Sequence, residues 1–258
     1  MLVVDLLHEF ELGVWKMLFT HAIRLLYASP NGSEKVELLN ERYRQLIKFP
    51  TCSQQHYRFR NTPTYGNSTI RRFASNASEM KKMAARDFED LLQVRASRTE
   101  TNMALFRFQC AIPAFEGLLE GEHNARFMKL LYRAAEWHAL AKLRMHTDPT
   151  LDRLDKVTAE FGRLMREFRD FTCTKFDTVE LLREAQARAR RQAESAGLST
   201  DATQNATRVA QRKTKGLNLQ TYKFHAMGDY VPTIKLFGTS DSYSTQPVCS
   251  HLLGCFFS

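Results

Sequence analysis

Glycine, proline and closely spaced cysteines are scarce in this chain of 258 residues. Its 11 glycines and 7 prolines are too few for a turn-rich β-sandwich, which favours helices. The five cysteines stand far apart, at positions 52, 110, 173, 249 and 255, and form no Cys-x-x-Cys pair. These absences argue against a disulfide framework or a thiolate zinc site and indicate an intracellular protein.

Long apolar runs and the common catalytic motifs are also missing. No apolar stretch has the length of a membrane span, and the first 28 residues carry too many charges for a signal peptide. The chain has no Gly-x-Ser-x-Gly, phosphate-binding glycine loop, His-Glu-x-x-His or dinucleotide-binding fingerprint. We therefore expect a nuclear or cytoplasmic protein that is neither secreted nor membrane-bound, and no hydrolase triad or nucleotide motor.

Positive charge exceeds negative charge, with 37 Lys and Arg against 28 Asp and Glu and a net charge of +9. Such a balance favours a polyanionic partner such as nucleic acid. The DNA-binding candidates are Arg71, Arg72, Lys81, Lys82, Arg188, Arg190, Arg191, Arg212, Lys213 and Lys215. The ordinary alternative is that these residues form solvated helix faces.

Apolar residues recur at helical spacing along most of the chain, so the fold class we predict is mainly α and bundle-like. The expected helices cover 5–28, 34–47, 75–92, 122–145 and 149–171. Asp148 is expected to cap the helix that Pro149 opens. Residues 183–216 are rich in Ala, Arg, Gln, Ser and Thr, which is typical of a frayed basic helix that runs into a disordered linker.

The first candidate site surrounds Asp5, which follows a short β-prone run and precedes His8 and Glu9. A carboxylate at a strand end is where metal-dependent phosphoryl-transfer folds hold Mg²⁺. The residues alone favour a plainer interpretation. In it Asp5 caps a helix, Glu9 lies in its first turns and His8 is solvated.

Two pairs of residues that include histidine give weaker signals. His225 and Asp229 are spaced i, i+4, so on a helix they would share a face and could bind a metal, although a surface pair is the simpler interpretation. His138 and His146 are about two helical turns apart, too far to share one metal directly. Trp137, beside His138, is expected in the core.

Six segments resemble, in order along the chain, transposases of mushroom-forming fungi. The resemblance is to the Plavaka type within the Kyakuja–Dileera–Zisupton superfamily. The segments are 4–16 (VDLLHEFELGVWK), 69–73 (TIRRF), 78–82 (SEMKK), 135–146 (AEWHALAKLRMH), 222–230 (YKFHAMGDY) and 237–246 (FGTSDSYSTQ). Each is modest alone, but together they are specific, and they occur in order from residue 4 to residue 246.

The resemblance implies a DDE-type transposase, whose ribonuclease-H-like core is split by a large helical insertion. In this chemistry three carboxylates hold two Mg²⁺ or Mn²⁺ ions that drive an in-line displacement on DNA. Asp5 corresponds to the second carboxylate and hence to a metal ligand. The first would lie upstream, and the third lies in a Glu-Leu-Glu-His-Arg-Arg segment that relatives have soon after the residue matching Gln246. The chain departs from the family there, so we expect a fragment that is inactive alone, holds no metal tightly and retains little or no β-sheet.

The resemblance also sets the expected organisation. Residues 1–182 form a helical domain with irregular inserts at 46–61 and 94–109, followed by a basic linker (183–216), an ordered return segment (217–246) and a tail outside the family pattern (247–258). The inserts have equal length, and the second runs from Val94 to Gln109, as a translated intron beginning GT and ending AG could. Transcript sequencing across codons 94–109 tests this hypothesis, and uniform retention in the mature message would contradict it. The alternative function is a non-catalytic helical DNA-binding or protein-interaction module, and the oligomeric state stays open.

Overall fold

The described part of this computed structural model comprises residues 4–48, 76–80, 83, 85–92, 111–197 and 210–243. Its secondary-structure elements are helices, and the one β-type pairing in these ranges is an isolated antiparallel bridge between Val179 and Thr214. The expected mainly α fold is therefore confirmed. The expected inserts, apart from residues 46–48, and the tail lie outside the described residues.

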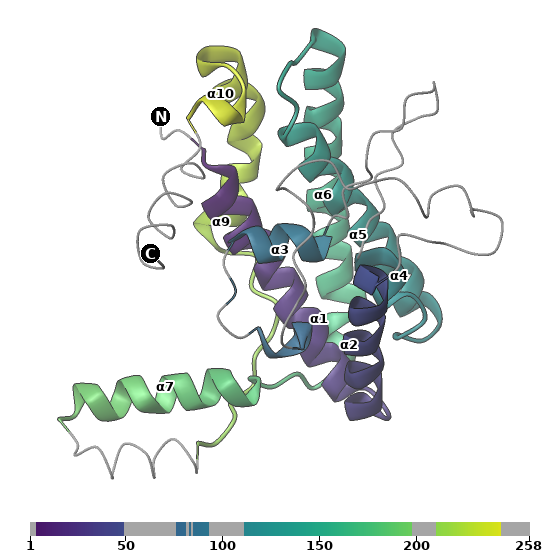
Figure 1. Cartoon of the computed structure of the whole chain (residues 1–258), viewed down its shortest axis with the longest axis vertical. Helices are drawn as coiled ribbons and strands as arrows, with labels where there is room; N and C mark the ends of the chain where they lie inside the picture. Colours follow the sequence, from purple (N-terminus) through teal and green to yellow (C-terminus); the bar gives the residue numbers. More distant parts are fainter. Residues whose placement is uncertain are drawn as a thin grey trace.

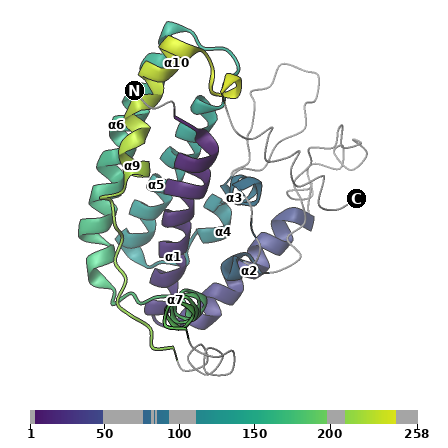
Figure 2. The same cartoon turned by 90° about the vertical axis from the view of Figure 1, so that its left-hand side faces the viewer.

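A continuous helical rod runs through the middle of the bundle and confirms the helix expected at 5–28 (Figures 1 and 2). Its first part, η1 (Leu6–Trp15), is a π-helix, and its second part, α1 (Lys16–Ala28), is an α-helix. Phe10, Trp15 and Phe19 along this rod are at most 1% exposed. Burial of such large apolar side chains is the main driving force for packing the other helices around the rod.

Helix α2 (Gly32–Lys48) returns beside α1 after a tight turn (Figure 1). A Cβ at Gly32 would lie 2.5 Å from the Leu26 carbonyl oxygen, so only glycine allows the chain to come this close. Tyr43 then packs edge-on against Phe19, with ring centroids 6.1 Å apart. The turn therefore fixes α2 against the rod.

The long helices α5 (Gly121–Ala141) and α6 (Asp148–Phe171) form a hairpin, preceded by the short α4 (Ala111–Phe115). Trp137 is fully buried, as expected, and its Nε1 donates to Thr158 Oγ1 at 2.8 Å. The expected cap at Asp148 is wrong. Thr147 is the N-cap, and its amide donates to Thr150 Oγ1 at 2.8 Å, so Asp148 already lies inside the helix.

The continuous helix expected at 75–92 is also wrong. The described residues there form a single 3₁₀ turn, η3 (Ala77–Glu79), and a separate helix, α3 (Ala85–Leu92). Met80 ends the turn in the left-handed conformation, with φ 48°. The Ser78 amide donates to Asn40 Oδ1 at 3.0 Å and Thr20 Oγ1 lies 3.4 Å from Met80 Sδ, so tertiary contacts on both sides hold the break.

The last part of the chain crosses both ends of the bundle. After η4 (Cys173–Lys175), α7 (Leu182–Ser195) lies crosswise at one end, and the chain then runs back along the bundle (Figures 1 and 2). It ends in α9 (Tyr222–His225), η5 (Ala226–Asp229), α10 (Tyr230–Phe237) and η6 (Ser240–Ser242). No helix in the described ranges combines the length and apolar character of a membrane span.

Candidate functional site

Four of the six segments named above meet at one end of the bundle, although they lie far apart in the sequence. Phe10 stacks on Trp137 with ring centroids 4.6 Å apart, and Trp137 meets Tyr230 edge-on at 4.8 Å. Ser240 Oγ donates to the Ala141 carbonyl oxygen at 2.8 Å. These contacts join four of the six segments, three of them at the buried Trp137 and the fourth at Ala141, four residues further along α5. The supporting elements are η1, α5 and α10.

Asp5 caps the π-helix of this site. Its backbone is extended, Oδ1 accepts from the Leu7 amide at 3.2 Å, and Oδ2 lies 2.6 Å from His8 Nδ1. The Asp5 amide donates to Glu9 Oε2 at 2.5 Å. Burial is the main reason that the Glu9 pKa is raised; the hydrogen bond from the Asp5 amide opposes this, and the charge of Asp5 adds to it. The helix-capping interpretation is confirmed, with His8 half-exposed but bound to Asp5.

The described residues do not fit the two-metal centre that the resemblance implies. No three His, Cys, Asp or Glu side chains among them are arranged to hold a metal ion. Asp5 already directs one carboxylate oxygen to the Leu7 amide and the other to the His8 imidazole. In the described structure Asp5 therefore acts as a helix cap.

The other histidines expected as weak candidates are also dispersed. His225 ends α9 and Asp229 ends η5, and both residues are exposed. His146 Nδ1 lies 3.4 Å from Thr150 Oγ1, at the start of α6. His138, on α5, is fully buried where α5 packs against η1. Its environment therefore differs from those of His225 and His146.

A buried carboxylate, Glu11, was not anticipated from the sequence. It is 2% exposed, and its Oε1 lies 3.0 Å from His138 Nε2. Its Oε2 has no hydrogen-bond partner among the described residues. Burial raises the Glu11 pKa to about 7, although the nearby Lys142 ammonium opposes the rise. The available signal was a single Glu beside Phe10 on the apolar face of the first helix.

Lys142 connects Glu11 to a third element. Its Nζ lies 2.6 Å from Glu89 Oε1 on α3 and 3.6 Å from Glu11 Oε1 on η1. The His138 ring also stacks on Phe10, with centroids 5.2 Å apart. The Glu11 cluster, defined as Glu11, Glu89, His138 and Lys142, therefore joins η1, α3 and α5 at the same end of the bundle as Asp5.

The second candidate site is the basic surface, formed by α7 and residues 210–216. Glu180 organises it: Arg188 Nη2 lies 2.9 Å from Glu180 Oε2, and Arg212 Nε donates to the Glu180 carbonyl oxygen at 2.5 Å. The Glu180 amide donates to the Lys213 carbonyl oxygen at 2.8 Å. Arg188 is the main cause of a lowered Glu180 pKa. Two of the predicted DNA-binding arginines thus also hold the fold together.

Residues 210–216 are hydrogen-bonded where the sequence predicts a disordered linker. The Lys215 amide donates to the Thr178 carbonyl oxygen at 2.9 Å, and Thr178 Oγ1 donates to the Lys215 carbonyl oxygen at 2.8 Å. Backbone pairing satisfies these polar groups without any large apolar side chain, which explains why composition alone predicts disorder. The side chains of this segment remain at the exposed surface.

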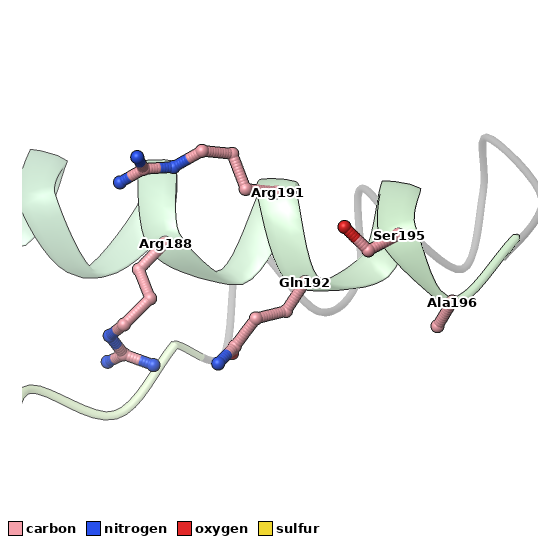
Figure 3. A pocket seen from close by; sticks show the side chains of 5 residues that line it. All are labelled: Arg188, Arg191, Gln192, Ser195 and Ala196. Atoms are coloured by element: carbon pink, nitrogen blue, oxygen red, sulfur yellow. The ribbon is translucent and has the colours of Figure 1, made fainter.

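Arg190 and Arg191 are the most outward candidates on α7. Arg190 is 64% exposed and pairs loosely with Glu194, with Nε and Oε1 3.5 Å apart. Arg191 is also exposed, and its Nε donates to the Ala187 carbonyl oxygen at 3.2 Å. A shallow hollow on this helix is lined by Arg188, Arg191, Gln192, Ser195 and Ala196. Arg188 and Gln192 point to one side of the ribbon and Arg191 to the other (Figure 3).

The remaining DNA-binding candidates, Arg71, Arg72, Lys81 and Lys82, lie outside the described residues.

Comparison of the chain with known protein families, with curated proteins and with solved structures finds no match. The six sequence segments therefore remain the basis of the resemblance.

Proposed function

We propose that this chain is the helical part of a DDE-type DNA transposase, that it does not catalyse strand transfer by itself, and that it binds DNA through the basic surface. The observation that carries the proposal is the convergence around Trp137. Four segments chosen for their resemblance to one family contact one another in space, as expected of motifs that share one structural role.

The absence of catalysis in this proposal rests on the chemistry of Asp5. Two-metal phosphoryl transfer needs several carboxylates to hold ions about 4 Å apart. Asp5 is instead engaged as the cap of η1, and the described residues supply no group around it that suits a metal ion. Neither Mg²⁺ nor Mn²⁺ is expected to bind tightly to this chain.

DNA binding in this proposal rests on the exposed charge of the basic surface. Arg190 and Arg191 project from α7, and Lys215 lies on the neighbouring segment. Side chains of this kind neutralise phosphates without reading bases, and binding then weakens as salt rises. We expect sequence-independent binding that is strong only at low ionic strength.

Fluorescence anisotropy with a labelled DNA duplex, measured over a salt series, tests this binding. Wild type should bind at low salt, and the Arg190→Ala, Arg191→Ala double variant should bind more weakly, with the logarithmic salt slope reduced by about 1 for each phosphate that the variant no longer neutralises. The control is Arg163→Ala, Arg166→Ala on α6, which removes two exposed arginines, one of them in an i, i+4 pair like that of Arg190. Absence of binding at low salt, or equal weakening in both variants, would refute the DNA-binding part and leave the protein-interaction module.

A nicking assay on supercoiled DNA tests the catalytic part. With Mg²⁺ or Mn²⁺ we expect no nicking by the full chain, because Asp5 alone cannot hold two ions. Nicking that disappears in Asp5→Asn would contradict the proposed inactivity. Nicking that persists in Asp5→Asn would show in addition that Asp5 does not correspond to the family's carboxylate.

A further inference from the structure

The Glu11 cluster contains an imbalance of charge that the proposed function does not use. Glu11 and Glu89 supply two carboxylates, whereas Lys142 supplies one ammonium group within 3.6 Å and 2.6 Å of them. With both carboxylates ionised and His138 neutral, the cluster carries a net negative charge. A buried unpaired charge is costly. One additional proton would make the cluster neutral and would remove this cost.

The position for that proton is the contact between Glu11 and His138. Glu11 Oε1 and His138 Nε2 are 3.0 Å apart, and both side chains are at most 3% exposed. A neutral imidazole can already donate across this distance from Nε2–H, and the extra proton then makes the pair either a carboxylate with an imidazolium or a carboxylic acid with a neutral imidazole. Lys142 is closer to Glu89 than to Glu11 and is partly exposed, so it only partly compensates Glu11.

We propose that Glu11 and His138 form a proton-dependent latch, which holds η1 against α5 while the pair retains one extra proton and loosens η1 when that proton passes to solvent. In the protonated state the cluster is neutral. In the deprotonated state Glu11 is a buried carboxylate beside a neutral imidazole. The latch concerns Asp5 directly, because Asp5 caps the same helix, but it does not depend on whether the chain binds DNA.

The other groups that face Glu11 leave this direction unchanged. Asp5 on η1 opposes ionisation of Glu11, and Glu11 in turn contributes to the raised pKa of the buried Tyr230 at the start of α10. Glu9 lies near the same tyrosine. Lys223 on α9 packs with its aliphatic carbons against Gly13. Among these neighbours the acidic groups add to the preference for a protonated pair, and Lys142 is the opposing charge.

The expected size of the pH effect follows from the linkage between proton binding and the opening of η1. The Glu11 pKa is about 7 in the folded state, against an ordinary value of 4.5, so the docked state binds the proton more tightly. Docking of η1 is then strongest below the ordinary pKa of 4.5 and is lost as the pH rises through the folded pKa of about 7. The opening equilibrium of η1 should increase about tenfold between about pH 6 and about pH 8.

Hydrogen exchange of the full chain, corrected for intrinsic rates, measures this opening. Wild type should lose protection in η1 over that pH range, while the middle of α6 should not. Glu11→Gln, which keeps the shape and cannot ionise, should abolish the pH dependence. The control is Glu136→Gln on α5. The partners of Glu136 are Arg133 and Arg153, and its replacement should leave the pH dependence of η1 unchanged. Equal pH dependence in wild type and Glu11→Gln would overturn the proposal.

A direct titration keeps the proposal falsifiable if Glu11→Gln fails to fold. The carboxyl carbon of Glu11 in wild-type protein can be followed by NMR after ¹³C labelling, with assignment by comparison with variants that fold. Titration near neutral pH, accompanied by shifts of η1 amides over the same range, supports the latch. Titration near the ordinary pH of an exposed Glu, or titration without any change in η1, overturns it.

Discussion

Gly13 is the residue at which η1 comes closest to α9. A Cβ there would lie 2.8 Å from Lys223 Cδ and 2.9 Å from the His8 carbonyl oxygen. The lysine side chain can move, but the backbone oxygen within the π-helix cannot easily do so. The absence of one side chain therefore permits segments 4–16 and 222–230 to pack together.

Gly13→Ala should lower the free energy of unfolding by about 1–3 kcal/mol, the usual cost of overpacking. The control is Gly162→Ala in the interior of α6, where a Cβ would meet only Arg166 Nη1 at 3.5 Å. That change should stabilise the protein by about 0.5–1 kcal/mol, because alanine favours helix. Urea unfolding followed by circular dichroism measures both, and a neutral Gly13→Ala would show that η1 adjusts freely.

Glu136 shows how a partly exposed carboxylate paired with arginines differs from the buried Glu11. Arg133 and Arg153 both donate to it, and Arg153 Nε lies 3.0 Å from Oε1. Partial burial raises the Glu136 pKa, but the hydrogen bonds from Arg153 and Arg133 outweigh it and lower the value overall. Its stabilisation is therefore present above the ordinary pKa of 4.5 and is lost as pH falls through the lower folded value.

Glu136→Gln should accordingly cost about 1 kcal/mol at neutral pH, and its difference from wild type should shrink as the solution is acidified below the ordinary Glu pKa. Thermal or urea unfolding over a pH series measures the effect. A difference that stays constant with pH would mean that the Arg–Glu pairs contribute through packing and not through charge.

At the scale of elements, α7 is attached to the bundle mainly at its first turn. Arg24 Nη2 lies 2.5 Å from Glu184 Oε1, and Arg183 donates to the Glu79 carbonyl oxygen. Arg188 then binds Glu180. Beyond these contacts the helix projects away from the bundle (Figure 1). Its stability therefore depends on a few polar contacts, on the burial of the small side chains Ala185 and Ala193, and on its own helix propensity.

Residues 190–195 of α7 should therefore exchange their amide hydrogens roughly tenfold or more faster than the middle of α5 and α6, because a short helix with little packing opens locally. Native-state hydrogen exchange measures this. Glu184→Gln should increase the difference by weakening the contact with Arg24. Exchange of α7 at the same rate as α5 would show that the helix unfolds only with the whole bundle.

At the scale of the whole molecule, the two candidate sites lie at opposite ends of the central rod (Figures 1 and 2). Asp5 caps the start of η1 and the Glu11 cluster lies further along the same helix, whereas the basic surface meets the far end of α1 through Arg24 and Glu184. Since α1 continues η1 without interruption, one helical rod contacts both sites. Loosening of η1 by the latch and opening of α7 are nevertheless separate local events with different causes.

Local sequence was sufficient to predict the helical fold class, most helix ranges, the burial of Trp137 and the role of Asp5 as a cap, because each depends on local periodicity and local hydrogen bonding. The break at Met80 was not predictable in this way, since contacts from α1 and α2 hold it in place. Nor was the turning of Arg188 and Arg212 toward Glu180. Burial of Glu11 against His138 depends on where α5 packs. Long-range packing sets these features, and helical periodicity contains no information about which distant side chain will be met.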